Sequence, residues 1–245
     1  MTRDATSHAG LAGFLAQADA VGIALLGILL LMSLASWALI LSKALALAAE
    51  RRRARAFLAS FWAAPTLETV GATLATLPAD AGRAEAFSQL ARSALAAHGH
   101  ARARQAPGSI DQSGPAADFL ARALRRAIDE DSARLESGLT VLASVGATAP
   151  FVGLFGTVWG VYHALAAIGA SGQGTLDRIA GPVGEALVMT ALGLAVAIPA
   201  VLAYNGFVRA NRVLLARLDG FAHDLHALLT VGAAVAPAAA RAQGR

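Results

Sequence analysis

The chain lacks cysteine altogether and is poor in charged residues. Without cysteine it cannot form a disulfide, a zinc–thiolate site or an iron–sulfur cluster, and it has no cysteine nucleophile. Charged residues make up only 15% of the chain, whereas 56% of its residues are hydrophobic. The mean hydropathy is correspondingly high, at +0.57. This composition is typical of a membrane protein rather than a soluble one.

Lysine and arginine exceed aspartate and glutamate, which gives a formal net charge of +4 and a pI near 10.6. Such values can indicate nucleic-acid binding. In this chain, however, the basic residues cluster beside apolar runs and are not interleaved with aromatic residues. We therefore expect no nucleic-acid partner and interpret the basic clusters as determinants of membrane topology.

The first long apolar run lies between Asp19 and Lys43 and contains no charged residue. At 1.5 Å per residue, it is long enough to cross ~30 Å of hydrocarbon. A signal peptide would carry its basic residues before a shorter apolar run. Here the basic residues follow the run, as Lys43, Arg51, Arg52, Arg53 and Arg55. The positive-inside rule then places the N-terminus outside the membrane and the following segment in the cytoplasm.

Two further apolar stretches lie in the second half of the chain. The stretch from Ser137 to Leu176 is too long for one span, so it holds a helix and its flanks, among them the turn-like segment "GASGQG". The third run extends from Ala186 to Val208 and is followed by Arg209, Arg212 and Arg217. Alternate crossings bring these arginines back to the cytoplasmic side, in agreement with the charge rule.

The three runs predict an all-α membrane protein with three transmembrane helices and a large helical cytoplasmic domain. In order, the expected segments are a periplasmic N-terminal segment (1–19), transmembrane helix 1 (20–42), a cytoplasmic helical domain (43–137), transmembrane helix 2 (138–168), a periplasmic loop (169–184), transmembrane helix 3 (185–208) and a cytoplasmic C-terminal helix and tail (209–245).

An amphipathic helix is expected just before the second span. Apolar residues recur at spacings of four and seven between Leu120 and Leu142, which is typical of a helix with one buried face. We expect this helix to continue unbroken into the membrane. Its wet face offers two ion pairs at i,i+4 spacing, Asp118 with Arg122 and Glu130 with Arg134.

Small residues recur at helical spacing along the second and third spans. In lipid, small side chains let helix backbones approach closely, and this dispersion contact drives association. Two prolines inside the spans each remove a backbone hydrogen bond and permit a kink. The residues expected to govern helix packing are Gly153, Gly156, Gly160, Gly193, Pro150 and Pro199.

Polar residues inside the spans are few. Thr157 and Thr190 lie equally far from the middle of the "GASGQG" turn, so an antiparallel hairpin sets them at similar depth, where they could face one site. The alternative is that each hydroxyl bonds only a carbonyl of its own helix. Glu185 opens the third span, and a carboxylate at such a depth normally faces a cavity and marks an ion or proton path. The alternative is an interfacial glutamate paired with Arg178.

Several other classes of function lack the residues they require. The pairs His98 with His100 and His223 with His226 have no further ligands at metal spacing, so no metal site is expected. We expect His163 to be interfacial rather than catalytic. The chain has no phosphate-binding GxxxxGK[ST] motif and no set of nucleophile, base and orienting group. It is therefore expected to be no enzyme and to need no cofactor.

Two segments, "GATAPFVGLFGTVWGVYHAL" and "GPVGEALVMTALGLAVAIPAVLAYNGFVR", resemble the ExbB/TolQ/MotA family of proton-channel proteins. The resemblance covers residues 138–212 and the layout of three spans. It implies a homopentameric ring in the bacterial inner membrane whose second and third spans line a pore. It also implies an ExbD-like single-span partner with a protonatable aspartate inside the pore. Proton flow then moves this partner, and a TonB-like protein passes the motion to receptors that import iron-siderophores, heme or vitamin B12.

The resemblance also assigns residues. Glu185 in "GEALVMTA" matches the pore glutamate of the family, Thr157 in "GTVWG" and Thr190 in "VMTALG" match its pore threonines, and Pro150 falls on a family position. The loop "HGHARARQAPGSIDQSGPA" is longer and more basic than the family pattern. The hairpin is more similar to the ExbB branch than to the TolQ branch, which maintains the cell envelope, and MotA-type proteins usually have four spans. Two alternatives stay open, a TolQ-like subunit and a non-conducting membrane scaffold.

Overall fold

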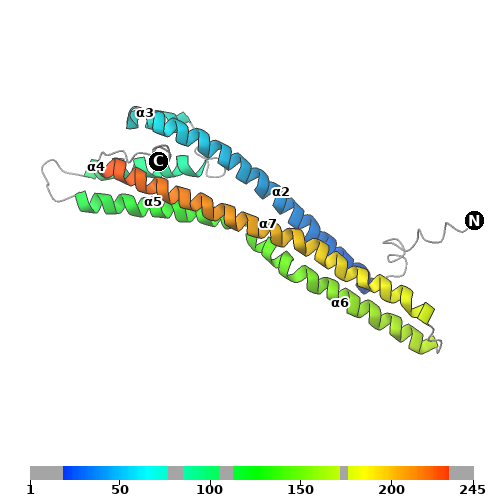
Figure 1. The fold of residues 1–245 in the computed structure, drawn as a ribbon. Coiled ribbons are helices and arrows are strands. Elements are labelled where there is room, and N and C mark those ends of the chain that lie inside the picture. The colour runs from blue at the N-terminus through cyan, green and yellow to red at the C-terminus, as the bar shows by residue number, and fades with distance from the viewer. Residues whose placement is uncertain (1–18, 77–84, 105–112, 172–175, 232–245) are drawn as a thin grey trace, which may run out of the picture. The chain divides into compact units, whose positions relative to one another are not determined.

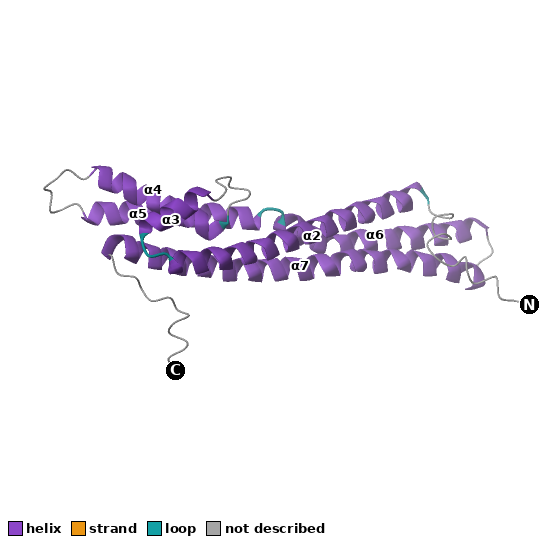
Figure 2. Cartoon of the chain, turned by 90° about the horizontal axis from the view of Figure 1, so that it is seen from above, coloured by secondary structure: helices purple, strands orange, loops and turns teal. Residues whose placement is uncertain are grey.

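The computed structural model describes residues 19–76, 85–104, 113–171 and 176–231. Within these ranges every regular element is an α-helix (Figures 1 and 2), which confirms the all-α prediction for this part of the chain. The helices are α2 (Ala20–Ala63), α3 (Leu67–Thr76), α4 (Ala86–Arg104), α5 (Ser113–Glu136), α6 (Leu139–Ser171) and α7 (Leu176–Val231).

Three helical segments are long and apolar enough to cross a membrane, and they belong to α2, α6 and α7. They carry the three runs that the sequence predicts as spans. Helices α2 and α7 extend beyond their apolar runs, since α2 continues to Ala63 and α7 continues to Val231. The chain is therefore a multi-pass membrane protein with three candidate spans.

The chain divides into two compact units. The first, here called the membrane unit, comprises Met1–Lys43 and Gly138–Phe207, and the second, the extramembrane unit, comprises Ala44–Ser137 and Val208–Arg245. Helices α2 and α7 contribute residues to both. The divisions fall beside the boundaries expected between the membrane spans and the polar domain.

Helices α6 and α7 form the hairpin of the membrane unit and lie side by side (Figure 1). The buried face of α6 repeats at helical spacing through Leu142, Val145, Ala149, Gly153 and Gly156. On α7 the buried face carries Ala186, Met189, Gly193, Ala197 and Ala200. Because most of these side chains are small, the two backbones meet closely, as expected for helices packed in lipid.

The extramembrane unit has an aromatic and aliphatic core. Phe221 on α7 lies against Phe61 on α2 and Phe87 on α4, with ring centroids 5.0 and 5.6 Å apart. Both contacts are edge-on, the arrangement that the charge distribution of aromatic rings favours. Leu120 and Leu124 of α5 complete this core, so it gathers helices from distant parts of the sequence.

The expected unbroken helix into the second span is wrong. Helix α5 ends at Glu136 and α6 begins at Leu139, with a turn between them. Gly138 adopts a φ of +76° there. This conformation is open to glycine but unfavourable for other residues, and it commonly ends a helix.

Neither of the two expected ion pairs is found among the described residues, where Asp118 makes no ion pair with Arg122. Arg134 bonds Asp131 at 2.6 Å rather than Glu130, and Glu130 bonds Arg126 at 2.9 Å. The reason is burial, because Asp131 is only 4% exposed and a buried carboxylate needs a partner more than an exposed one does.

The connection expected as a periplasmic loop over residues 169–184 is mostly helical. Helix α6 reaches Ser171 and α7 starts at Leu176. Residues 172–175 lie outside the described residues.

Candidate functional site

Two threonines meet across the hairpin. The Oγ1 hydroxyl of Thr190 on α7 donates to Oγ1 of Thr157 on α6 over 3.4 Å, a long and weak hydrogen bond. The Thr157 hydroxyl in turn donates to the carbonyl oxygen of Leu154 over 2.6 Å. For Thr157 the two alternatives are not exclusive. Its hydroxyl donates to a carbonyl of its own helix and also accepts a hydrogen bond from Thr190 on the other helix. The hairpin brings the pair to one depth, as the symmetry of the sequence predicts.

The threonine pair sits in a seam of glycines. A Cβ built on Gly153 would lie 2.6 Å from the carbonyl oxygen of Met189, and one built on Gly160 would lie 2.9 Å from Cβ of Ala186. A Cβ on Gly156 would lie 2.9 Å from the side chain of Met189. A side chain at Gly153 or Gly160 would separate the helices and with them the two hydroxyls, because the atoms that it would meet cannot rotate away.

The two prolines occur within continuous helix. Pro150 lies inside α6, eleven residues after its first residue Leu139, and Pro199 lies inside α7. Neither ends its helix, although each lacks the N–H that would bond the carbonyl four residues earlier. Both are partly buried and belong to the hairpin that carries the threonines.

The backbone of Glu185 belongs to α7, directly before Ala186, which packs against Gly160. Thr190 follows Glu185 by five positions in α7, a rise of about 7.5 Å along the helix axis. The side chains of Glu185 and Arg178 lie outside the described part of the structure, so the expected pore role of Glu185 and its alternative, a pairing with Arg178, both stay predictions. Tyr162, which the hairpin symmetry sets opposite Glu185, is 63% exposed.

Sequence reasoning missed a polar contact between α2 and α6. The Trp159 indole donates its Nε1 proton to Oδ2 of Asp19 over 2.6 Å, and the Gly22 amide donates to Oδ1 of Asp19 over 2.8 Å. These bonds, with the Gly22 amide as the larger influence, lower the pKa of Asp19 from its usual value. His163 lies beside them, with Nε2 3.8 Å from Asp19 Oδ2. The available signal was an aspartate directly before an apolar helix, where it acts as an N-cap.

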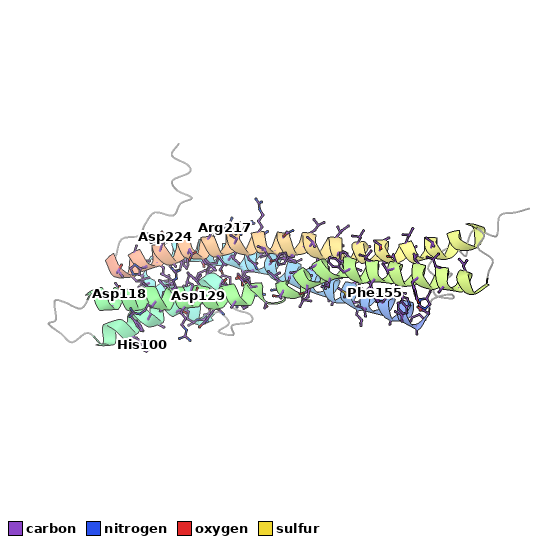
Figure 3. The ribbon with its side chains drawn as sticks, turned by 90° about the horizontal axis from the view of Figure 1, so that it is seen from below. His100, Asp118, Asp129, Phe155, Arg217 and Asp224 are labelled. Atoms are coloured by element: carbon purple, nitrogen blue, oxygen red, sulfur yellow. The ribbon has the colours of Figure 1, made fainter. Side chains whose placement is uncertain are left out.

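The other histidines that the structure describes lie in the extramembrane unit. In the part of the chain that the structure describes, no three histidine or acidic side chains are grouped to hold a metal ion. His226 approaches the carbonyl oxygen of Ala117 with Nε2 at 3.3 Å, joining α7 to α5. His100 is exposed on α4 (Figure 3).

The sequence also gave no indication of two buried carboxylates in the extramembrane unit. Glu85 caps α4, accepting from the amides of Phe87 and Ser88 at 3.0 Å each. Burial raises the pKa of Glu85 to about 7. Burial likewise raises the pKa of Asp131 to about 6, although the nearby Arg134 opposes the change.

Comparison with known proteins agrees with this architecture. Residues 84–220 match the model of the MotA/TolQ/ExbB proton channel family. A biopolymer transport protein ExbB from Xanthomonas campestris pv. campestris is 49% identical over 178 residues, covering 72% of this chain and 68% of the relative. An ExbB from Neisseria meningitidis serogroup B is 42% identical over 218 residues, covering 86% of this chain and 93% of the relative. A Tol-Pal system protein TolQ from Pseudomonas aeruginosa is 34% identical over 230 residues, covering 94% and 96%.

The family match spans the glycine seam, both threonines and the polar helices before them, and the relatives cover most of the chain at substantial identity. The chain therefore belongs to the MotA/TolQ/ExbB proton channel family.

Proposed function

We propose that this chain is the channel subunit of a bacterial inner-membrane motor of the ExbB type, in which proton flow energises TonB-dependent transport across the outer membrane. It acts as a channel and motor component and not as an enzyme. Identities of 49% and 42% to ExbB proteins, against 34% to a TolQ protein, support the ExbB assignment. The observation that carries the site is the hydroxyl contact of Thr190 with Thr157 at 3.4 Å between α6 and α7.

The direction of the hydrogen bonds suggests what the pair does. Thr157 is 6% exposed and directs its proton to Leu154, whereas Thr190 is half-buried and directs its proton to Thr157. The hydrogen bonds thus run from Thr190 to Thr157 to the Leu154 carbonyl, and the lone pairs on Oγ1 of Thr190 are the acceptors that remain accessible. They would accept a hydrogen bond from water or from a protonated carboxyl group. In a narrow pore of low polarity such a bond stabilises the neutral acid.

The ring, the partners and the orientation belong to this proposal. Copies of the chain form a ring, a homopentamer by family resemblance, with an ExbD-like single-span protein in its pore and a TonB-like protein as recipient of the motion. The basic residues after α2's apolar run and after Val208 favour a cytoplasmic extramembrane unit and a periplasmic N-terminus. Glu185 lies at the periplasmic mouth of the third span and takes part in the proton path.

Substitution of Glu185 tests the motor function. In a strain lacking the native gene, Glu185→Gln should abolish growth on ferric siderophore while the membrane complex still assembles, as seen on native gels. Gly156→Leu, which would strike the Met189 side chain, should instead prevent assembly. Normal siderophore-dependent growth of Glu185→Gln would contradict the proton-path role and favour a scaffold.

A TolQ-like role is the second candidate, because this chain matches the TolQ protein of Pseudomonas aeruginosa over 96% of that protein's length. The two roles predict different defects in a deletion strain. Loss of an ExbB-type motor starves the cell of iron, whereas loss of a TolQ-type subunit causes periplasmic leakage and detergent sensitivity. Leakage with normal iron uptake would move the assignment to the TolQ branch.

A further inference from the structure

We propose that Asp19 and Trp159 are positioning residues that set the rotation of α6 and thereby hold Thr157 against Thr190. The contact between Asp19 and Trp159 joins residues 140 positions apart in the sequence. The importance of the threonines rests on the proposed function, but their positioning can be measured without it.

The geometry places the two contacts on opposite sides of one helix. Thr157 and Trp159 are two residues apart on α6, so their side chains point about 200° apart around its axis. Thr157 faces α7 through Thr190, and Trp159 faces the start of α2 through Asp19. At this depth α6 is therefore held from both sides, and turning the helix would break both contacts.

The contact to Asp19 is the stronger of the two. Its donor–acceptor distance is 2.6 Å and its acceptor is a carboxylate, whereas the threonine contact is 3.4 Å between two neutral hydroxyls. Hydrogen bonds to ionised acceptors are roughly twice as strong as neutral ones. The glycine seam offers few side chains that could interlock and resist rotation of the helix. The contact with Asp19 therefore adds a constraint on rotation from the outer side of α6.

Both ends of the contact are themselves held in place. Asp19 uses its other oxygen to accept the Gly22 amide, so it is fixed to the first turn of α2. The indole of Trp159 is flanked on α6 by Phe155 (labelled in Figure 3), with ring centroids 6.3 Å apart, and by His163 at 4.6 Å. These ring contacts limit rotation of the indole relative to α6.

The test uses the absence of cysteine from the chain. Thr157→Cys with Thr190→Cys introduces a reporter pair, and its rate of disulfide formation in membranes that contain the full complex measures how well the two positions face each other. Asp19→Asn keeps an acceptor for the Gly22 amide but replaces Oδ2 with an amide donor. Trp159→Phe keeps the aromatic ring and removes the N–H. Trp37→Phe, at an exposed tryptophan of α2, is the matched control.

A second reporter pair separates positioning from general loosening. Gly146→Cys with Val201→Cys joins the same two helices away from Asp19, where the Cβ atoms would be 3.6 Å apart, a separation suited to a disulfide. Asp19→Asn and Trp159→Phe should each slow cross-linking of the 157–190 pair by about tenfold, as expected for loss of a hydrogen bond to a charged group. Neither substitution should change the cross-linking rate of the 146–201 pair. The control Trp37→Phe should change the rate of neither pair.

Unchanged cross-linking of both pairs would overturn the proposal, and an equal loss in both pairs would overturn it in favour of a purely structural role. If Asp19→Asn does not accumulate in the membrane, Trp159→Phe decides alone, because it preserves the ring packing. The proposed function fails separately, if Thr157→Val and Thr190→Val support normal siderophore uptake whatever the cross-linking shows.

Discussion

Gly153 and Gly193 face each other across the hairpin, and neither position has room for a side chain. A Cβ on Gly153 would lie 2.6 Å from the carbonyl oxygen of Met189, and a Cβ on Gly193 would lie 2.6 Å from the carbonyl oxygen of Ala149. Carbon and oxygen atoms do not approach so closely, and the obstacles are backbone atoms that cannot rotate away. The close approach of α6 and α7 therefore depends on glycine at both positions.

Gly153→Ala or Gly193→Ala should separate the helices and weaken assembly of the complex, by about 1–3 kcal/mol as for other overpacked sites. The measurement is the fraction of assembled complex on native gels across a temperature series. Gly206→Ala on the same helix is the control, because no atom lies within 4 Å of its added Cβ. Equal behaviour of all three variants would show that the seam tolerates side chains.

Removal of either hydroxyl of the threonine pair should impair transport without disturbing assembly. Thr190→Val and Thr157→Val keep the shape of the side chain, whereas Thr157→Ser keeps the hydroxyl and should retain most activity. Growth on ferric siderophore is the readout. Thr148→Val is the control on α6, because Thr148 is exposed and bonds only the carbonyl oxygen of Ser144, at 2.7 Å. A defect in Thr148→Val equal to that in Thr190→Val would contradict a special role for the pair.

The sequence was sufficient for the three candidate spans, the hairpin and the meeting of Thr157 with Thr190, because hydropathy and helical spacing are local properties. It was insufficient for the contact of Asp19 with Trp159, which depends on how α2 lies against α6. The break at Gly138 was missed because a single glycine in an apolar pattern does not reveal its φ. The partner of Arg134 was misjudged for a related reason, since helical spacing does not show that Asp131 is buried.

The extramembrane unit should lose stability as the pH rises through neutrality. Burial raises the pKa of Glu85 from 4.5 to about 7 in the folded protein. A carboxyl group with a raised pKa binds its proton more tightly when folded, so its stabilising effect is complete below pH ~4.5 and is lost as the pH passes ~7. Asp131, whose pKa burial raises to about 6, adds to the same trend at slightly lower pH.

Glu85→Gln should flatten this dependence, because glutamine stays neutral and its amide oxygen can still accept from one of the two helix amides. The measurement is the melting temperature of the purified complex between pH 5.5 and pH 8. Glu68→Gln, at an exposed glutamate on α3, is the control and should follow the wild type. A wild-type melting temperature that rises between pH 6 and pH 8 would contradict the assigned sign.

Gly138→Ala tests whether the break between α5 and α6 matters. The φ of +76° is unfavourable for alanine by about 1–2 kcal/mol. The added Cβ would also lie 3.3 Å from Cδ2 of Leu39, a tight contact within the membrane unit. We therefore expect a lower melting temperature, or a local change in which α5 and α6 join into one helix.

Gly99→Ala separates this strain from the general effect of replacing glycine. Gly99 lies within α4 with no atom within 4 Å of its added Cβ. Since alanine favours helix over glycine by about 0.5–1 kcal/mol, Gly99→Ala should stabilise the protein slightly. Opposite shifts in melting temperature for the two variants would support a break that needs glycine. An increase for Gly138→Ala as well would show that a continuous helix is accessible at no cost, and the turn at residues 137–138 would then have no structural requirement for glycine.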